Sequence, residues 1–179
     1  MQLGEDTITM SMTLNPVNEA AFQKAVQSLE TLNRAAVFHP TGTGKSCIAW
    51  KVVEAHPQTT FFWLVAGAQR LALRQAELTR YNGGTLPGNV RFCDCEKLAA
   101  ATPEQWVRLG EQKPGCIVLD CYHELSAVCW AQSVQKLLRM CPQAKVLGLG
   151  VPNGAPVCAA AQELFADCIV SHMLSLIHI

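Results

Sequence analysis

The sequence of 179 residues is poor in charge and in aromatic side chains. Charged residues make up 16% of the chain and aromatic residues 7%, whereas half of the chain is hydrophobic. Fourteen basic residues balance fourteen acidic ones, so no overall electrostatic attraction to nucleic acid or membranes is expected. Such a composition is typical of a folded globular protein and not of a disordered one, and the length suits a single domain.

The chain also lacks the segments that direct proteins to or through a membrane. No apolar run approaches the roughly 18 residues of a membrane-spanning helix. The amino-terminal stretch has Glu5 and Asp6 but no lysine or arginine before Lys24, which is the opposite of the charge order of a signal peptide. The sequence therefore predicts a soluble, cytoplasmic protein with no membrane partner.

The nine cysteines include no C-x-x-C pair. An odd number of scattered cysteines without an export signal favours reduced thiols that act as small hydrophobic side chains. A zinc site that uses Cys93 and Cys95 is the alternative, although structural zinc normally requires two paired ligand clusters at tighter spacing.

Short apolar segments alternate with segments of helical periodicity along the chain. Strands are expected at residues 35–39, 59–66, 89–93, 115–120 and 144–150, and helices at 15–33, 46–56, 69–81, 103–109 and 126–140, with a last helix and a short strand within 159–170. This alternation predicts an α/β fold in which a mostly parallel sheet lies between helix layers.

The stretch HPTGTGKS, residues 39–46, has the composition of a phosphate-binding loop between a strand and a helix. Glycines let backbone amides approach phosphates, and the following helix directs its positive end at them. Lys45 is expected to neutralise the β- and γ-phosphates of ATP, and the Ser46 hydroxyl to hold Mg²⁺. The alternative is a surface turn without a ligand. The residues expected to contact the nucleotide in this loop are Thr41, Gly42, Thr43, Gly44, Lys45 and Ser46.

His39 occupies the place of the first glycine in the general phosphate-loop pattern, and PTGTGKS instead resembles the variant found in superfamily 2 helicases, the DEAD/DEAH-box group. The resemblance extends in order over residues 14–173 and implies a RecA-like P-loop NTPase lobe, the first ATP-binding lobe of such a helicase. Asn18 is similar in place to the glutamine by which the family recognises adenine, with a shorter reach.

The stretch WLVAGAQRLALRQ stands in the place of the family's motif Ia, which follows a nucleic-acid backbone. The resemblance implies that Arg70 and Arg74, one helical turn apart, contact nucleic-acid phosphates. The alternative is a solvated basic face of the helix.

The stretch VLDCYHEL falls where the family has D-E-x-H. The resemblance implies that Asp120 steadies Mg²⁺ through its water shell and that His123 links the ATP site to motif III. Cys121 replaces the glutamate that activates the attacking water, and a thiol with an ordinary pKa near 8.5 is a poor general base. Loss of a general base typically removes roughly 10² to 10⁴ in rate. The place of motif III, residues 147–156, also lacks the family's hydroxyl-bearing triplet.

The expected organisation is a variable segment at 1–13, the ATP-binding lobe at 14–173 and a tail at 174–179. The tail sequence LSLIHI resembles the translation of a transposase adapter used in sequencing libraries, and the alternative is a short apolar strand. A second helicase lobe is expected in the full-length protein, because the family's arginine finger, worth roughly 10³ to 10⁵ in hydrolysis, lies there.

Three functions are compatible with these features. The resemblance implies the ATP-binding lobe of a helicase, with ATP and Mg²⁺ as cofactors, that couples ATP hydrolysis to the remodelling of nucleic acid, DNA being favoured over RNA. A non-hydrolysing, nucleotide-gated binding module is the second function, because motifs II and III are altered. A small-molecule P-loop kinase is the third, and the lack of an arginine-rich lid segment argues against it.

Overall fold

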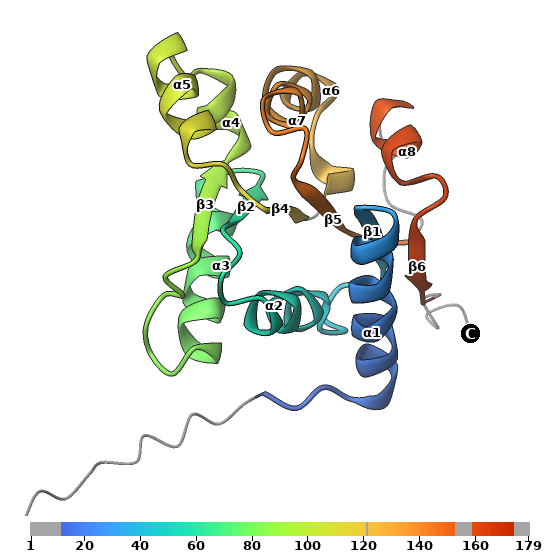
Figure 1. Cartoon of the computed structure of the whole chain (residues 1–179). Coiled ribbons are helices and arrows are strands. Elements are labelled where there is room, and N and C mark those ends of the chain that lie inside the picture. Colours follow the sequence, from blue (N-terminus) through green and yellow to red (C-terminus); the bar gives the residue numbers. More distant parts are fainter. Residues whose placement is uncertain (1–11, 121, 153–158, 174–179) are drawn as a thin grey trace, which may run out of the picture.

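The computed structural model describes residues 12–120, 122–152 and 159–173. These residues form one six-stranded sheet in the order β3-β2-β4-β5-β1-β6 (Figure 1), in which each pair of neighbouring strands is parallel. The predicted α/β fold with a parallel sheet is confirmed. The strands are β1 (Arg34–Phe38), β2 (Phe61–Val65), β3 (Val90–Asp94), β4 (Cys116–Asp120), β5 (Lys145–Gly150) and β6 (Ile169–His172).

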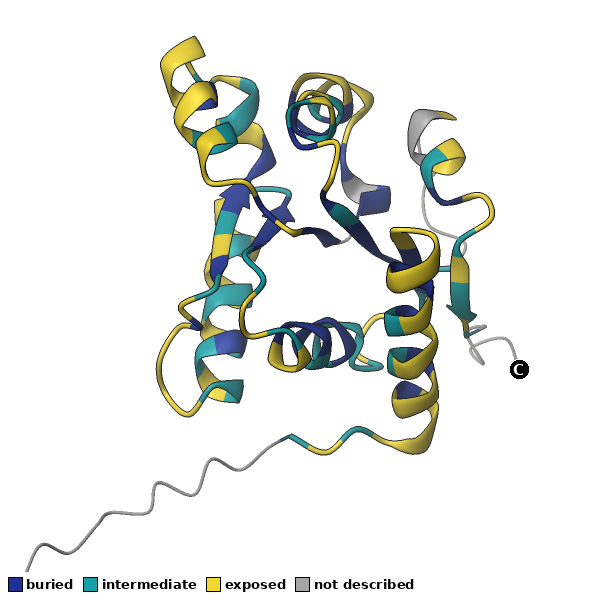
Figure 2. Cartoon of the chain, viewed as in Figure 1, coloured by how far each residue is buried: buried dark blue, intermediate teal, exposed yellow. Residues whose placement is uncertain are grey.

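Helices cover both faces of the sheet (Figure 1), as a parallel sheet with apolar strands requires. One face is covered by α1 (Pro16–Thr31), α2 (Lys45–Ala55) and α3 (Ala68–Tyr81). The other carries α4 (Cys95–Ala99), α5 (Pro103–Glu111), α6 (Ala127–Cys129), a π-helical turn (Trp130–Val134), α7 (Gln135–Met140) and α8 (Ala159–Phe165). Figure 2 shows the inner strands β2, β4 and β5 as largely buried, the edge strand β6 as partly exposed and the outer helix surfaces as exposed.

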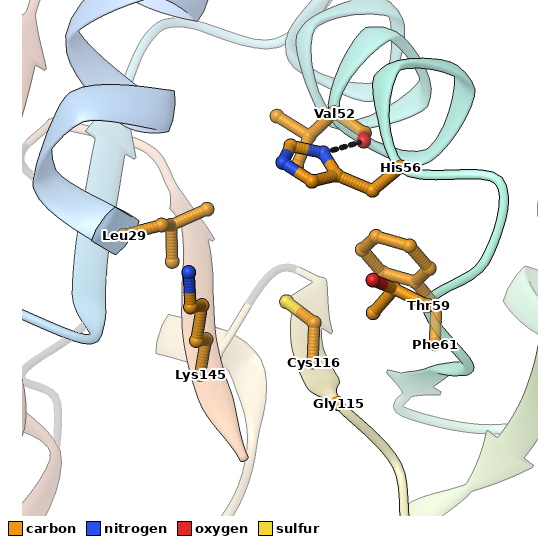
Figure 3. Close-up of a pocket in the computed structure, with 8 residues that line it drawn as sticks. All are labelled: Leu29, Val52, His56, Thr59, Phe61, Gly115, Cys116 and Lys145. Carbon is orange, nitrogen blue, oxygen red and sulfur yellow. Dashed lines mark hydrogen bonds between the residues drawn. The ribbon is translucent and has the colours of Figure 1, made fainter.

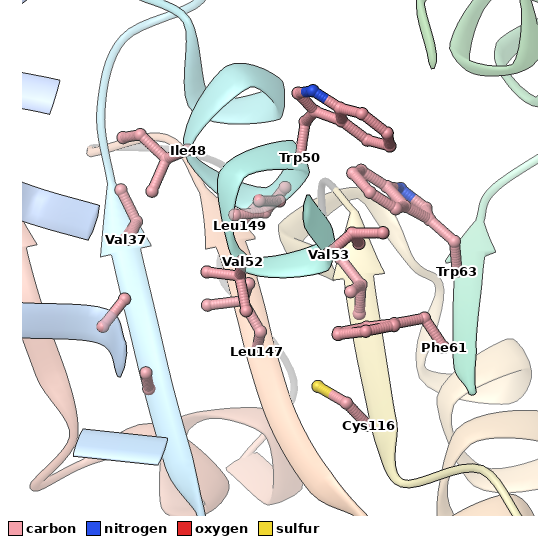
Figure 4. Close-up of a cluster of buried hydrophobic side chains, with 14 of the residues drawn as sticks. Val37, Ile48, Trp50, Val52, Val53, Phe61, Trp63, Cys116, Leu147 and Leu149 are labelled. Carbon is pink, nitrogen blue, oxygen red and sulfur yellow. The ribbon is translucent and has the colours of Figure 1, made fainter. Parts of the chain in front are cut away.

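Alternating side chains of each strand enter two separate hydrophobic clusters. In the cluster under α1 and α2 (Figure 4), Val52 and Val53 of α2 pack with Leu147 of β5 and with Phe61 and Trp63 of β2. The next residues along these strands point to the opposite cluster, which lies under α5, α7 and α8. Because both faces are apolar, the strand sequences show no polar alternation.

The first helix begins where its capping residues predict. The Asn15 side chain accepts a hydrogen bond from the Asn18 backbone amide at 2.9 Å, and Pro16 occupies the first helical turn. The helix places Asn18 beneath the loop that follows β1.

The predicted helix at 126–140 is helical throughout but not uniformly α-helical. Its central turn is a π-helix, and Ser133 in that turn donates its hydroxyl to the Cys95 carbonyl oxygen at 2.7 Å. This contact joins it to α4, a five-residue helix that the sequence analysis missed. Asp94 caps α4 by accepting from the Glu96 amide at 3.0 Å.

None of the helices in the described part of the chain is long and apolar enough to span a membrane. Several sequence-based expectations lie outside the described residues. These are the role of Cys121, the part of the motif III stretch that follows Pro152, and the nature of the tail at 174–179.

Candidate nucleotide-binding site

The loop between β1 and α2 has the backbone geometry of a phosphate-binding turn. Gly42 and Gly44 adopt φ angles of 82° and 90°, a region that side-chain-bearing residues rarely enter. A Cβ atom at Gly44 would also lie 2.8 Å from the Asn18 amide nitrogen. Glycine at position 44 is therefore required by both the backbone angle and the close approach of α1.

The Lys45 side chain folds back over this loop. Its ammonium group donates to the carbonyl oxygens of His39 at 2.7 Å and Pro40 at 2.9 Å. Thr43 also donates its hydroxyl to the Pro40 oxygen, at 2.7 Å. These bonds hold the ammonium at the carboxyl end of β1, where α2 begins.

The amino end of α2 lies in the loop itself. Lys45 is the first helical residue and Gly44 the N-cap, which has no side chain to cap the helix. Ser46, half-buried, lies in the first turn. Backbone amides at such a helix start present partial positive charge to an anion.

Asn18 ties α1 to the loop. The side chain is 4% exposed, and its amide nitrogen donates to the Thr43 carbonyl oxygen at 2.8 Å. The side-chain oxygen is buried and has no hydrogen-bond partner among the described residues. The structure thus places Asn18 against the loop backbone, and recognition of adenine by this residue stays a prediction.

Asp120 ends β4 as a buried carboxylate, 2% exposed. Its Oδ2 atom accepts from the Trp63 indole at 3.1 Å and from Arg74 Nε at 2.5 Å. Arg74 also pairs with Glu77, one turn further along α3. The Asp120 charge is therefore already compensated within the chain.

The two arginines expected to contact nucleic acid differ in their surroundings. Arg74 is half-buried in the ion pair with Asp120, whereas Arg70 is exposed. A solvated basic face, the alternative, therefore does not describe Arg74. Phosphate contact stays a prediction for both residues.

Two buried histidines flank Lys45. Burial, followed by the charges of Lys45 and His172, lowers the pKa of His39. Burial also lowers the pKa of His123, as do the charges of Lys45 and Arg70, with Asp120 opposing them. Both histidines are thus kept neutral beside a positively charged loop, which is an environment suited to an anion.

His39 fills the place that a glycine has in the general loop pattern. Its ring lies fully buried, and Nε2 lies 2.7 Å from the Ser171 hydroxyl of β6. The sequence analysis missed this partner, as it missed Trp63 beside Asp120 and Glu77 beside Arg74. No local pattern marks Ser171 or Trp63, because each contacts a residue far away in the sequence, whereas Glu77 lies only three residues from Arg74 in α3.

A nucleoside triphosphate fits the donor set of this loop, which combines one ammonium group, a helix start and glycine-dependent turns. A metal ion held through Asp120 fits less well, because Arg74 and Trp63 already engage Oδ2 of that carboxylate. The described residues contain no cluster of three or more histidine, cysteine or acidic side chains that could hold a metal. Cys93 and Cys95 therefore form no zinc site with described partners.

No protein-family model and no curated protein sequence matches the chain. Solved structures do match. A hypothetical ATP-dependent RNA helicase from Sulfolobus tokodaii superposes with a TM-score of 0.58 and 12% identity over 86% of this chain and 51% of that one. The large terminase ATPase domain of Thermus phage P74-26 gives a TM-score of 0.55 and 12% identity, over 83% of this chain and 69% of that domain.

A third match is the ATP-dependent Type ISP restriction-modification enzyme LlaBIII bound to DNA, with a TM-score of 0.54, 14% identity and coverage of 78% of this chain and 13% of that enzyme. The chain spans about half the length of the Sulfolobus helicase. At these identities the likeness concerns the fold alone. The chain has the α/β fold of the RecA-like lobes found in helicases and related ATPases.

Proposed function

We propose that this chain is the ATP-binding lobe of a helicase-like ATPase of superfamily 2 and that residues 41–46 bind the triphosphate. The observation that carries the proposal is the position of Lys45. Its ammonium lies over a loop turned by two glycines of positive φ, at the start of α2 and at the carboxyl edge of a parallel sheet. Ligands of open α/β sheets bind at this edge.

The proposed binding step exchanges donors and acceptors within the loop. Lys45 leaves the carbonyl oxygens of His39 and Pro40 and donates to phosphate oxygens, a charge-assisted and therefore stronger bond. The amides at the start of α2 contact the phosphates, while Asn18 keeps the loop fixed through Thr43. Mg²⁺ would neutralise the phosphate oxygens, and the Ser46 hydroxyl would hold it.

ATP hydrolysis coupled to remodelling of nucleic acid is the proposed activity of the whole protein. It rests on the order of motifs along the sequence and on the fold shared with an ATP-dependent RNA helicase and with an ATP-dependent enzyme bound to DNA. Arg70, exposed on α3 near the carboxyl edge, is the proposed phosphate contact for nucleic acid. A second lobe would have to complete the catalytic site.

A non-hydrolysing nucleotide-gated module is the second candidate. The Asp120–Arg74 ion pair favours it, because the carboxylate expected to support the metal is engaged by a cation of the chain itself. The cysteine at position 121 also favours the non-hydrolysing module, since a thiol is a poor replacement for a carboxylate general base.

Titration of the full chain with a fluorescent ATP analogue tests the binding site. Lys45→Ala should weaken binding at least tenfold, because a charge-assisted contact to the triphosphate is lost. Lys24→Ala is the matched control, since Lys24 lies on the exposed face of α1, outside the loop. Equal ATP affinity of wild type and Lys45→Ala would exclude the site.

Phosphate release separates the two candidates once binding is established. In the longer protein, release stimulated by DNA or RNA supports the helicase-like ATPase. If the wild type binds ATP without releasing phosphate and Cys121→Glu restores phosphate release, the protein is a helicase-like ATPase that has lost its general base. Binding without release in both forms supports the gated module.

A further inference from the structure

A pocket lies at the opposite edge of the sheet from the proposed phosphate-binding loop. It has a volume of about 240 Å³ and opens between the carboxyl ends of α1 and α2 and the first residues of β2, β4 and β5 (Figure 3). Its walls are Leu29, Val52, His56, Thr59, Phe61, Gly115, Cys116 and Lys145.

One row of side chains across three strands forms the floor of this pocket. Phe61 of β2 is in register with Cys116 of β4, and Cys116 is in register with Lys145 of β5. Partners in register point to the same face of a sheet, so this row faces α1 and α2. The following row, which contains Trp63, Val118 and Leu147, is fully covered.

The pocket lies beside the carboxyl end of α2. The helix ends at Ala55, and His56 is its C-cap. His56 Nδ1 lies 2.8 Å from the Val52 carbonyl oxygen, and since a carbonyl only accepts, Nδ1 carries the proton of that bond. Nε2 is then the ring nitrogen that can meet a ligand.

The pocket combines apolar walls with a single cation. Leu29, Val52, Phe61 and Cys116 are buried, whereas Lys145 is half-buried. Figure 3 shows the Lys145 side chain extending from β5 into the same space as Cys116. No carboxylate lines the pocket, and Lys145 has no ion pair with any described residue.

We propose that this pocket binds a compact apolar monoanion, such as a monocyclic aromatic carboxylate, with its ring against Phe61, Val52 and Cys116 and its carboxylate on Lys145 Nζ. The volume suits this class, because an apolar cavity of about 150 Å³ already admits benzene. A half-buried ammonium beside apolar walls attracts an anion and repels a cation. The Thr59 hydroxyl supplies a further donor at the rim.

The ligand is held without covalent chemistry. Burial raises the pKa of the Cys116 thiol to about 12, so the sulfur acts as an apolar wall at neutral pH. The site is also independent of the ATP-binding proposal, because it lies at the other end of the strands and shares no residue with the loop.

Benzoate is the first probe, and its binding is followed by chemical-shift changes in the ¹⁵N-labelled full chain. Benzoate should bind with a dissociation constant of the order of a millimolar or tighter. Benzylamine, which has nearly the same shape and the opposite charge, should bind at least tenfold more weakly. Equal binding of both, or no benzoate binding, would overturn the proposal without recourse to any variant.

Two variants then locate the contact. Lys145→Met should weaken benzoate binding about tenfold or more and leave benzyl alcohol binding within about twofold, while Lys24→Met, on the exposed face of α1, should change neither. Cys116→Met, which extends into the pocket, should weaken both ligands. Unchanged benzoate binding in a folded Lys145→Met or Cys116→Met protein would place the ligand elsewhere and contradict the proposal.

Discussion

Arg74 Nε lies 2.5 Å from Asp120 Oδ2, and this ion pair joins α3 to the carboxyl end of β4. The Asp120 side chain is 2% exposed and that of Arg74 20%, so the pair lies at the boundary of the core. Trp63 adds a second donor to the same oxygen at 3.1 Å. A carboxylate this buried needs such compensation.

Arg74→Gln is therefore expected to destabilise the protein by about 1–3 kcal/mol, because a charge-assisted bond is lost and a buried charge is left with one donor. Urea unfolding of Arg74→Gln, Asp120→Asn and the double variant gives the coupling energy. The double variant should lose less than the sum of the single variants.

Arg108→Gln serves as the matched control, since Arg108 is an exposed arginine of α5. Its free energy of unfolding should stay within about 0.5 kcal/mol of wild type. Additive losses in the Arg74 and Asp120 variants would show that the ion pair does not contribute to stability.

The order and type of most elements could be predicted from the sequence because local signals mark them. Asn15 with Pro16 marks the start of α1, and Gly83 and Gly84, both with positive φ, follow the end of α3. Apolar, β-branched segments mark strands that are buried on both faces. The loop proposed to bind phosphate could be recognised because its two glycines and Lys45 lie within eight consecutive residues.

The contacts around that loop could not be predicted, because they join residues far apart in the chain. Trp63 reaches Asp120 across 57 positions and His39 reaches Ser171 across 132. Their pairing depends on the strand order, which the sequence pattern does not specify. The ion pair of Arg74 with Asp120 was missed for the same reason, since nothing near Arg74 in sequence indicates a buried acidic partner.

Three cysteines should resist alkylation in the native protein. Burial raises the pKa values of Cys93, Cys95 and Cys116 to about 12, so at pH 8 only about 10⁻⁴ of each thiol is thiolate. Iodoacetamide treatment followed by peptide mapping should leave these three unmodified until denaturant is added. The half-buried Cys129 and Cys168 are the internal comparison. Rapid native labelling of Cys93 or Cys95 would contradict the buried placement of β3 and α4.

Stability should decrease as the pH falls below about 6.5. Burial and the charges of Lys45 and His172 lower the pKa of His39 from 6.5, so the unfolded chain binds a proton that the folded chain does not. The stabilising contribution of neutral His39 is fully present above the pKa of the unfolded chain and is lost as the pH falls toward the lower pKa of the folded protein. For one group, this loss is at most about 1.4 kcal/mol per pH unit.

His39→Gln isolates this contribution, because glutamine can still reach Ser171 but does not titrate. Urea unfolding at pH 7.5 and pH 5.5 should show a smaller loss for the variant than for wild type. Some dependence should remain, since the pKa of His123 is also lowered by burial and by neighbouring cations. Identical losses in the two proteins would mean that the pKa of His39 is the same in the folded and unfolded states.

Substitution of Asn18 distinguishes two roles for its side chain, contact with the adenine base and support of the loop backbone. Its amide nitrogen donates to the Thr43 carbonyl oxygen at 2.8 Å, so Asn18→Ala should loosen the loop around any triphosphate. The loss of one such bond corresponds to about 1 kcal/mol, or roughly fivefold in affinity. ATP and GTP should therefore weaken by the same factor in direct titrations, while Gln23→Ala, on the exposed side of α1, should change neither. A loss confined to ATP would instead show that the Asn18 amide contacts adenine, because only a base contact distinguishes two nucleotides with identical phosphates.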